Sequence, residues 1–150
     1  MADIRPATPA DRDAIVRLLE AQFVEHAIDT PPAAVARAVA ELLDAPERAR
    51  FVVASRDGRV VGVAAISFVT PLEHAARSIW LEELYVEPAE RGRGVGTALL
   101  EAACALAAAC GAVAVDLEVD AAHERAANLY RRAGFAPLPR TRWVRRLTPG

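Results

Sequence analysis

A glycine-rich turn between a predicted strand and a predicted helix constrains this chain more than any other feature. The alternating apolar run at residues 78–87 is typical of a strand, and the long apolar run at 97–110 is typical of a helix. Between them, Gly92, Gly94 and Gly96 allow positive φ and let a ligand approach the backbone closely. The first amides of a helix are unpaired donors at the positive end of its dipole, so the turn predicts an anion-binding site. The alternative is an ordinary strand-to-helix turn with flexible glycines.

Two common nucleotide-binding motifs do not account for this turn. A P-loop needs a Lys before its Ser or Thr, and the chain contains no Lys, because all 18 of its basic residues are Arg. A dinucleotide fingerprint needs G-x-G-x-x-G at the start of a parallel βαβ unit. Here the glycines stand at alternate positions after strands that are predicted to be antiparallel.

The rest of the chain predicts helices and strands without a linker or an internal repeat. Thr8 and Pro9 have the pattern of a helix start, and Asp57-Gly58 is a strong hairpin-turn signal between two apolar strands. In chain order we expect an extended start at 4–5, helices at 8–27 and 31–44, strands at 51–55, 60–69 and 78–87, a helix at 97–110, a strand at 112–120, a helix at 123–134 and a last strand at 142–147.

Length, composition and charge limit the class of protein. With 150 residues and 53% hydrophobic side chains, the chain predicts a single domain, 1–150, with a sizeable core. The formal net charge of -2 disfavours nucleic-acid binding. The sequence contains neither a signal peptide nor an uncharged apolar stretch of about 18 residues, so we expect a cytoplasmic protein with no membrane partner.

The cysteines and histidines do not have the spacing of a zinc or haem site, and we expect no metal. Cys104 and Cys110 lie in one predicted helix, where their spacing turns them about 240° from each other. They therefore cannot form a disulfide within that helix, and we expect two reduced, small, buried side chains.

The glycine turn resembles the pyrophosphate loop of the GCN5-related N-acetyltransferases (the GNAT family), whose R-x-x-G-x-G pattern matches residues 91–96. A second block, A-x-x-L-Y-x-x-x-G-F, is matched by Ala126, Leu129, Tyr130, Gly134 and Phe135. The resemblance covers nearly the whole chain. It implies an α/β (α+β) fold with a mixed, mostly antiparallel, splayed β-sheet flanked by helices, and acetyl-CoA as co-substrate between the fourth and fifth strands. Locally, residues 80–96 look most like the branch that acetylates diamines and other small amines.

The reaction implied by this resemblance needs a proton acceptor. An alkylamine with a pKa of about 10.4 is almost wholly charged at pH 7, and exposing its lone pair costs about 4.6 kcal/mol. Glu82 matches the catalytic Glu of the diamine branch and is the expected general base, directly or through water, with Glu83 as the reserve candidate. Regular alternation would put Glu82 on the face of Leu84 and Glu83 on the face of Tyr85, so only one would point at the acceptor. The alternative for each is a solvated carboxylate on a half-exposed strand.

The leaving thiolate needs a proton donor. A tyrosine hydroxyl is protonated at neutral pH and can donate. The resemblance assigns this role to Tyr130. The alternative is an aromatic core residue with an anchored hydroxyl.

By the same resemblance, strand amides hold the pantetheine arm and the oxyanion, the turn holds the phosphates, and two later segments line the far side. His123 stands where relatives often carry Asn. The expected cofactor-binding set is Leu84, Tyr85, Val86, Arg91, Gly92, Arg93, Gly94, Val95, Gly96, Thr97, Glu118, His123, Arg125 and Ala126. Further groups that could face the acceptor are Glu25, His26, Asp29, Glu73 and His74.

These features predict an N-acetyltransferase that transfers the acetyl group of acetyl-CoA to a primary amine of a small, cationic acceptor. We expect direct attack, since neither Cys is placed to serve as nucleophile. The alternatives are a non-catalytic acyl-CoA-binding regulatory module on the same fold, or a transferase for protein N-termini or aminoglycosides. The expected partner is the small-molecule amine, with no nucleic acid and no membrane, and relatives in the family are often homodimers.

Overall fold

A computed structural model describes residues 1–148 of the chain. The chain forms two compact units, Met1–Glu118 and Val119–Gly150, which we describe separately. None of the helices in the described residues combines the length and the apolar character needed to cross a membrane.

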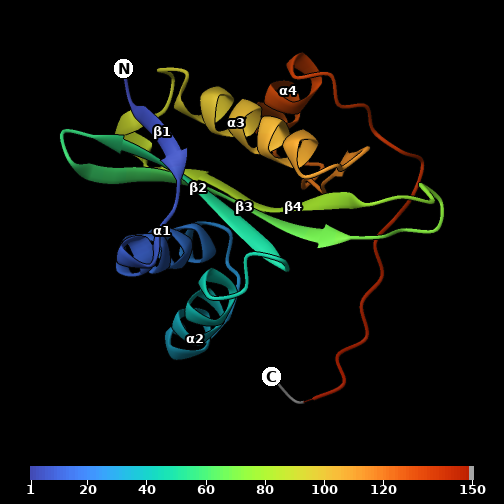
Figure 1. The fold of residues 1–150 in the computed structure, drawn as a ribbon, viewed down its shortest axis with the longest axis horizontal. Coiled ribbons are helices and arrows are strands. Elements are labelled where there is room, and N and C mark those ends of the chain that lie inside the picture. Colours follow the sequence, from blue (N-terminus) through green and yellow to red (C-terminus); the bar gives the residue numbers. More distant parts are fainter. Residues whose placement is uncertain (149–150) are drawn as a thin grey trace. The chain divides into compact units, whose positions relative to one another are not determined.

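The first unit is built on a five-stranded sheet in the order β1-β2-β3-β4-β5 (Figure 1). Neighbouring strands are antiparallel from β1 to β4, and β5 is parallel to β4. This confirms the expected mixed, mostly antiparallel sheet. The strands are β1 (Asp3–Pro6), β2 (Ala49–Arg56), β3 (Arg59–Val69), β4 (Ser78–Val86) and β5 (Val115–Asp116).

The β2–β3 hairpin forms at the Asp-Gly dipeptide, as predicted. Asp57 and Gly58 have φ values of 51° and 77°. Two central residues with positive φ form a tight turn whose twist matches that of the flanking strands. The turn therefore sets the pairing of β2 with β3 where the hairpin begins.

Helices cover both faces of this sheet, α1 and α2 on one side and α3 on the other (Figure 1). Ile15 and Leu18 of α1 are fully buried on the first face, and Leu99 and Leu100 of α3 on the second. Burial of these apolar stripes accounts for the predicted helical spacing. The elements are η1, a 3-10 turn (Pro9–Asp11), α1 (Arg12–Glu25), α2 (Pro32–Leu43), η2, a second 3-10 turn (Pro88–Glu90), and α3 (Val95–Ala109).

Helix α3 lies very close to the sheet at Gly62 of β3. A Cβ atom at this position would lie 2.9 Å from Leu99 Cδ1 and 3.2 Å from the carbonyl oxygen of Tyr85. The missing side chain lets the helix that follows the glycine turn rest directly on β3, which fixes where that helix begins relative to β4.

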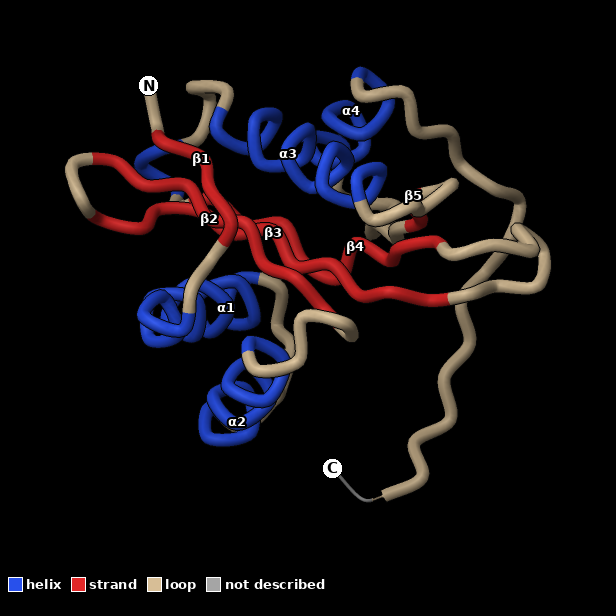
Figure 2. The backbone as a smooth tube through the Cα atoms, viewed as in Figure 1, coloured by secondary structure: helices blue, strands red, loops and turns tan. Residues whose placement is uncertain are grey.

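The sheet splays between β4 and β5. The two strands pair only at Ile79 with Val115 and at Trp80 with Asp116 (Figure 2). Among the described residues, no strand continues along this edge of β4 beyond Trp80. The strand expected over 112–120 is thus much shorter than predicted. We call residues 78–81 the closed half of β4 and residues 82–86, which have a strand neighbour only on the β3 side, the open half.

The second unit contains α4 (Glu124–Arg132), which confirms the predicted helix there. The Tyr130 ring lies edge-on to Phe135, with ring centroids 5.8 Å apart. The expected strand at 142–147 is wrong, because these residues form no helix or strand and Trp143 is 89% exposed. Pro137 and Pro139 remove amide donors from the preceding segment, and no described strand pairs with 142–147.

Candidate active site

A β-bulge at Glu82 shapes the candidate site. Ala65 of β3 pairs with Glu83 and Ile66 pairs with Leu81, so Glu82 is one residue in excess on β4. The extra residue interrupts the alternation of the strand. Glu82 accepts a hydrogen bond from the Ser67 hydroxyl at 2.6 Å.

The bulge corrects the expectation that Glu82 and Glu83 point to opposite faces. Ser67 lies two residues along β3 from Ala65, so its partner Glu82 is on the same face as Ala65. Glu83 is paired with Ala65 and is hydrogen-bonded to Gln22 of α1, on that same face. Both carboxylates therefore lie on the face that α1 and α2 cover.

Glu83 is half-buried, and its pKa is raised from 4.5 to about 7. Burial is the largest cause, because a carboxylate loses hydration in a low-dielectric setting. The charges of Glu82 and Glu118 raise the pKa further, and the hydrogen bond from Gln22 partly opposes them. A carboxyl group that titrates near neutral pH can both take and release a proton there.

Glu82 differs from Glu83 in exposure. Its side chain is exposed, and its recorded partner is the Ser67 hydroxyl. Three acids that were predicted for the site, Glu82, Glu83 and Glu118, are thus close enough in the first unit for the charges of the other two to act on Glu83.

The glycine turn ends as the N-terminus of α3, as predicted. Gly92 and Gly94 have φ values of 76° and 80°, and Gly94 is the N-cap residue. The amide of Ala98 donates to the Gly94 carbonyl at 3.0 Å, and no side chain caps this end. The amides of Val95, Gly96 and Thr97 precede the first intrahelical bond, so this end can take an anion.

The predicted phosphate ligand Arg91 holds the turn to α1. Its Nη1 and Nη2 donate to the two carboxylate oxygens of Glu25 at 2.9 and 2.8 Å, and its Nε donates to the Val86 carbonyl at 2.9 Å. The guanidinium carbon lies 5.3 Å from the centre of the Tyr85 ring. The hydrogen bond from Arg91 is the main cause that lowers the pKa of Glu25. Arg93 is more exposed, and its guanidinium is 3.9 Å from Glu90.

His74 belongs to the junction between the β3–β4 connection and β5. Its Nε2 lies 3.0 Å from Asp116 Oδ2, and the buried Ser78 hydroxyl donates to the Ala114 carbonyl at 2.9 Å. These contacts fix the closed half of β4 at the point where the sheet begins to splay.

Four of the residues predicted for the cofactor and the reaction belong to the second unit. His123 is the N-cap residue of α4, and Arg125, Ala126 and Tyr130 lie on that helix. Tyr130 is half-buried and contacts Phe135.

The two cysteines are free, as expected, and each is half-buried. Burial is the main cause that raises the pKa of the Cys104 thiol, which disfavours the thiolate that a nucleophile requires. This agrees with the expectation that Cys104 is not the nucleophile.

Neither Gln22 nor Ser67 was predicted for the site, and the pairing of Glu25 with Arg91 was not expected either. Gln22 carried one usable signal, since it stands three and four residues after Leu19 and Leu18, on the apolar stripe of α1. A polar side chain in such a stripe must find a partner or a ligand. The sequence around Ser67 contained no such signal, because the bulge in β4 is what brings Ser67 to Glu82.

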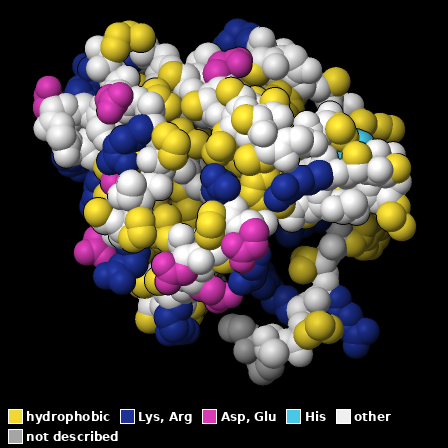
Figure 3. Space-filling model, in the orientation of Figure 1, with side chains coloured by type: hydrophobic (Ala, Val, Ile, Leu, Met, Phe, Trp, Pro, Cys, Tyr) yellow, Lys and Arg dark blue, Asp and Glu magenta, His cyan; other side chains and the backbone are white. Residues whose placement is uncertain are grey.

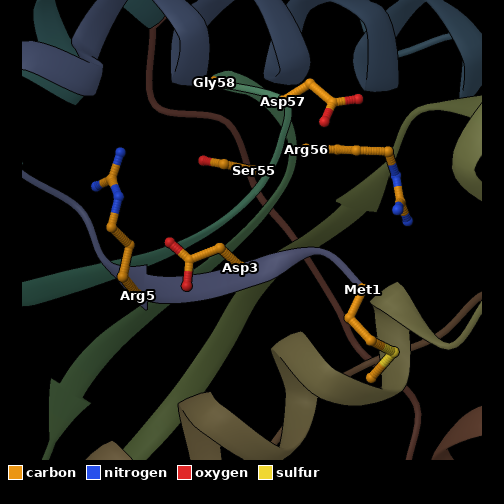
Figure 4. A pocket seen from close by; sticks show the side chains of 7 residues that line it. All are labelled: Met1, Asp3, Arg5, Ser55, Arg56, Asp57 and Gly58. Atoms are coloured by element: carbon orange, nitrogen blue, oxygen red, sulfur yellow. The ribbon is translucent and has the colours of Figure 1, made fainter.

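A polar hollow of about 420 Å³ lies at the β2–β3 turn (Figure 4). Its two arginines are already paired, Arg5 with Asp11 at 2.8 and 2.9 Å and Arg56 with Glu90 at 2.6 Å. Over α1 and α2, acidic and basic side chains are interspersed on the surface (Figure 3). The hollow is lined by Met1, Asp3, Arg5, Ser55, Arg56, Asp57 and Gly58, none of which was predicted for the site.

Comparison with known proteins gives one family. The model described as the acetyltransferase (GNAT) family matches residues 12–135. An uncharacterized N-acetyltransferase of Mycobacterium tuberculosis is 36% identical over 96 residues, 64% of this chain and 58% of that protein. The streptothricin acetyltransferase of Streptomyces lavendulae is 36% identical over 102 residues, 65% of this chain and 49% of that protein. The chain thus spans about half the length of these two relatives.

Among solved structures, an aminoglycoside N-acetyltransferase in complex with CoA superimposes with a TM-score of 0.86. It is 20% identical, and the match covers 99% of this chain and 96% of that chain. The likeness confirms the predicted splayed fold. Acetyl-CoA is the acetyl donor of the matched family, which confirms the predicted co-substrate at the level of the family.

Proposed function

Because the chain belongs to the acetyltransferase (GNAT) family, we propose that it transfers the acetyl group of acetyl-CoA to a primary amine of a small, cationic acceptor. The observation that carries this proposal is Glu83, a half-buried carboxyl group with a pKa of about 7 on the open half of β4. The match over residues 12–135 includes parts of both compact units, which supports the view that the chain works as one domain, 1–150.

The cofactor is held by main-chain groups. The amides at the start of α3 bind the diphosphate, and the turn is kept in place by Arg91 through Glu25 and Val86. Along the open half, the strand edge without a neighbour binds the pantetheine arm as an added strand, through Leu84 to Val86. Glu118, His123, Arg125 and Ala126 line the far side of the cofactor.

Glu83 serves as the general base, in place of the first sequence candidate Glu82. The amine nitrogen attacks the thioester carbonyl carbon, the C–N bond forms, and its proton passes to the Glu83 carboxylate. A base with a pKa near the working pH is half ionised and can accept that proton repeatedly. Glu82 is exposed and acts through its charge, which raises the pKa of Glu83.

Collapse of the tetrahedral intermediate breaks the C–S bond and releases the thiolate of CoA. Tyr130 donates its hydroxyl proton to that thiolate, a role supported by its place in the A-x-x-L-Y-x-x-x-G-F block. Free amides on the open half hold the oxyanion meanwhile. The acetyl group passes directly from sulfur to nitrogen, and no covalent enzyme intermediate forms.

The acids around Glu83 support a cationic acceptor. Glu82 and Glu118 add negative charge beside the base. The positive charge of an ammonium group would offset the repulsion among these carboxylates. Two of the compared proteins are named for streptothricin and aminoglycoside acetylation. The family branch that acetylates diamines offers the same chemistry on a smaller molecule, and a diamine is the first acceptor to test.

The test is thiol release from acetyl-CoA with diamines, aminoglycosides, amino acids and a peptide N-terminus as acceptors, together with calorimetry of CoA binding. We expect release with cationic amines, and an acid limb of kcat/KM near pH 7. Binding of CoA without thiol release for any amine would instead support the non-catalytic acyl-CoA-binding module. Absence of CoA binding at millimolar ligand would contradict both functions.

A further inference from the structure

Gln22 is a polar side chain in the core of the first unit, and one of its atoms lacks a partner. It lies on α1 and is 8% exposed. Its Oε1 is buried with no hydrogen-bond partner among the described residues. A buried acceptor without a donor is costly, and native proteins rarely retain one without a use for it.

The orientation of the amide follows from its neighbours. Its Nε2 lies 3.5 Å from the Leu84 carbonyl oxygen, and the side chain is hydrogen-bonded to Glu83. Both neighbours are acceptors, so the nitrogen must face them. Turning the amide over would set its oxygen against a carbonyl and a carboxylate. The oxygen without a partner is therefore Oε1, held beside the open half of β4.

We propose that Gln22 is an acceptor-binding residue whose carbonyl oxygen takes a hydrogen bond from the attacking amine nitrogen. This inference rests on the proposed function. The attacking primary amine carries two N–H donors beside its lone pair. One hydrogen goes to Glu83 as a proton, and Gln22 retains a second in a hydrogen bond. That bond fixes the direction of the lone pair toward the thioester.

The same side chain positions the base. Its amide nitrogen donates to Glu83 and so favours the ionised carboxylate. Gln22 thereby joins two tasks on one amide, with the nitrogen holding the base and the oxygen holding the nucleophile. An apolar side chain of the same size could do neither.

The decisive variant is Gln22→Met, which keeps the length of the side chain and removes both polar atoms. We expect KM for the amine to rise about ten- to a hundredfold, since a hydrogen bond to a charged group is lost. KM for acetyl-CoA should stay unchanged. The titration midpoint of the Glu83 carboxyl group, followed by its ¹³C chemical shift, should move to higher pH. Leu19→Met, a core change on the same helix, is the matched control and should move none of these values.

An unchanged amine KM in Gln22→Met would overturn the proposal, whether or not the Glu83 midpoint moves. Gln22→Leu repeats the test if the first variant unfolds. The amine used is the best acceptor of the wild-type screen, starting from 1,4-diaminobutane. Failure of the proposed function would show as no thiol release by the wild-type protein, whereas failure of this inference shows only in the variants.

Discussion

The closed half and the open half of β4 differ in burial and in strand pairing. In the closed half, Ser78 and Ile79 are fully buried, and the strand has neighbours on both edges. In the open half, the strand bulges at Glu82, loses its neighbour on the β5 side and carries two carboxylates on one face. The contrast teaches that the candidate site arises where the regular pairing of β4 is interrupted, because strand amides and acids are available to a ligand there.

Partial burial is what makes the open half useful. A carboxyl group in the closed half would be sealed from any acceptor, and one in bulk water would keep its ordinary pKa near 4.5. Glu83 lies between these limits, with a pKa of about 7, while Glu82 beside it is exposed. The comparison predicts different consequences for removing each carboxylate.

The largest expected effect is on turnover. Glu83→Gln removes the proposed base and should lower kcat/KM for the amine by about 10²- to 10⁴-fold at pH 7, with CoA affinity nearly unchanged. Glu82→Gln removes only a neighbouring negative charge, so it should lower the pKa of Glu83 and move the acid limb of the pH–rate profile to lower pH. Its rate at pH 8 should stay within about tenfold of wild type.

Thiol release measured from pH 5.5 to 9 checks both variants. The reverse order, with Glu82→Gln the more damaged enzyme and an acid limb that does not move, would return the role of base to Glu82. Calorimetry with CoA controls for damage to the cofactor site.

The sequence predicted the local turns of this molecule better than the irregular pairing of its strands. The Asp57-Gly58 hairpin and the start of α3 after the glycine turn were predictable, because each depends on local backbone chemistry. The bulge at Glu82 was not, since it depends on a pairing with β3 that the sequence of β4 does not mark. Strict alternation therefore gave the correct face for Glu83, that of Tyr85, and the wrong face for Glu82.

Long-range partners explain the other differences. The segment 142–147 has strand-like residues, but a strand needs a neighbour, and residue type alone does not say whether one exists. The spacing of Gln22 on α1 indicates a buried polar side chain, but the sequence does not show that Glu83 is its neighbour. The phosphate role expected for Arg91 stays a prediction, and its side chain is engaged by Glu25 and Val86.

A second effect should appear in stability. The folded protein raises the pKa of Glu83 from 4.5 to about 7, so between these values the unfolded chain releases its proton first. The folded state therefore loses stability as pH rises from about 4.5 to about 7. Glu83→Gln removes this loss and should raise the free energy of unfolding by about 1–2 kcal/mol at pH 8, with no gain at pH 4.

Urea unfolding at pH 4, 6 and 8 measures this difference. Glu82→Gln is the control and should gain less at pH 8, because Glu82 is exposed. An equal gain for Glu83→Gln at all three pH values would mean that Glu83 titrates normally, and the distinction between the two glutamates would be lost.

The smallest expected effect concerns how the open half is joined to the glycine turn. Arg91 uses its Nε on the Val86 carbonyl and both terminal nitrogens on Glu25, so its side chain acts as a clamp while backbone amides bind the phosphates. Arg91→Ala and Glu25→Gln should then both weaken CoA binding, by about three- to tenfold, as an ion pair at a partly exposed site contributes about 1 kcal/mol. If Arg91 binds phosphate directly, Glu25→Gln would release it and strengthen CoA binding instead. Calorimetry at two salt concentrations separates these cases, with Arg48→Ala as control, because its pair with Glu41 lies outside the site.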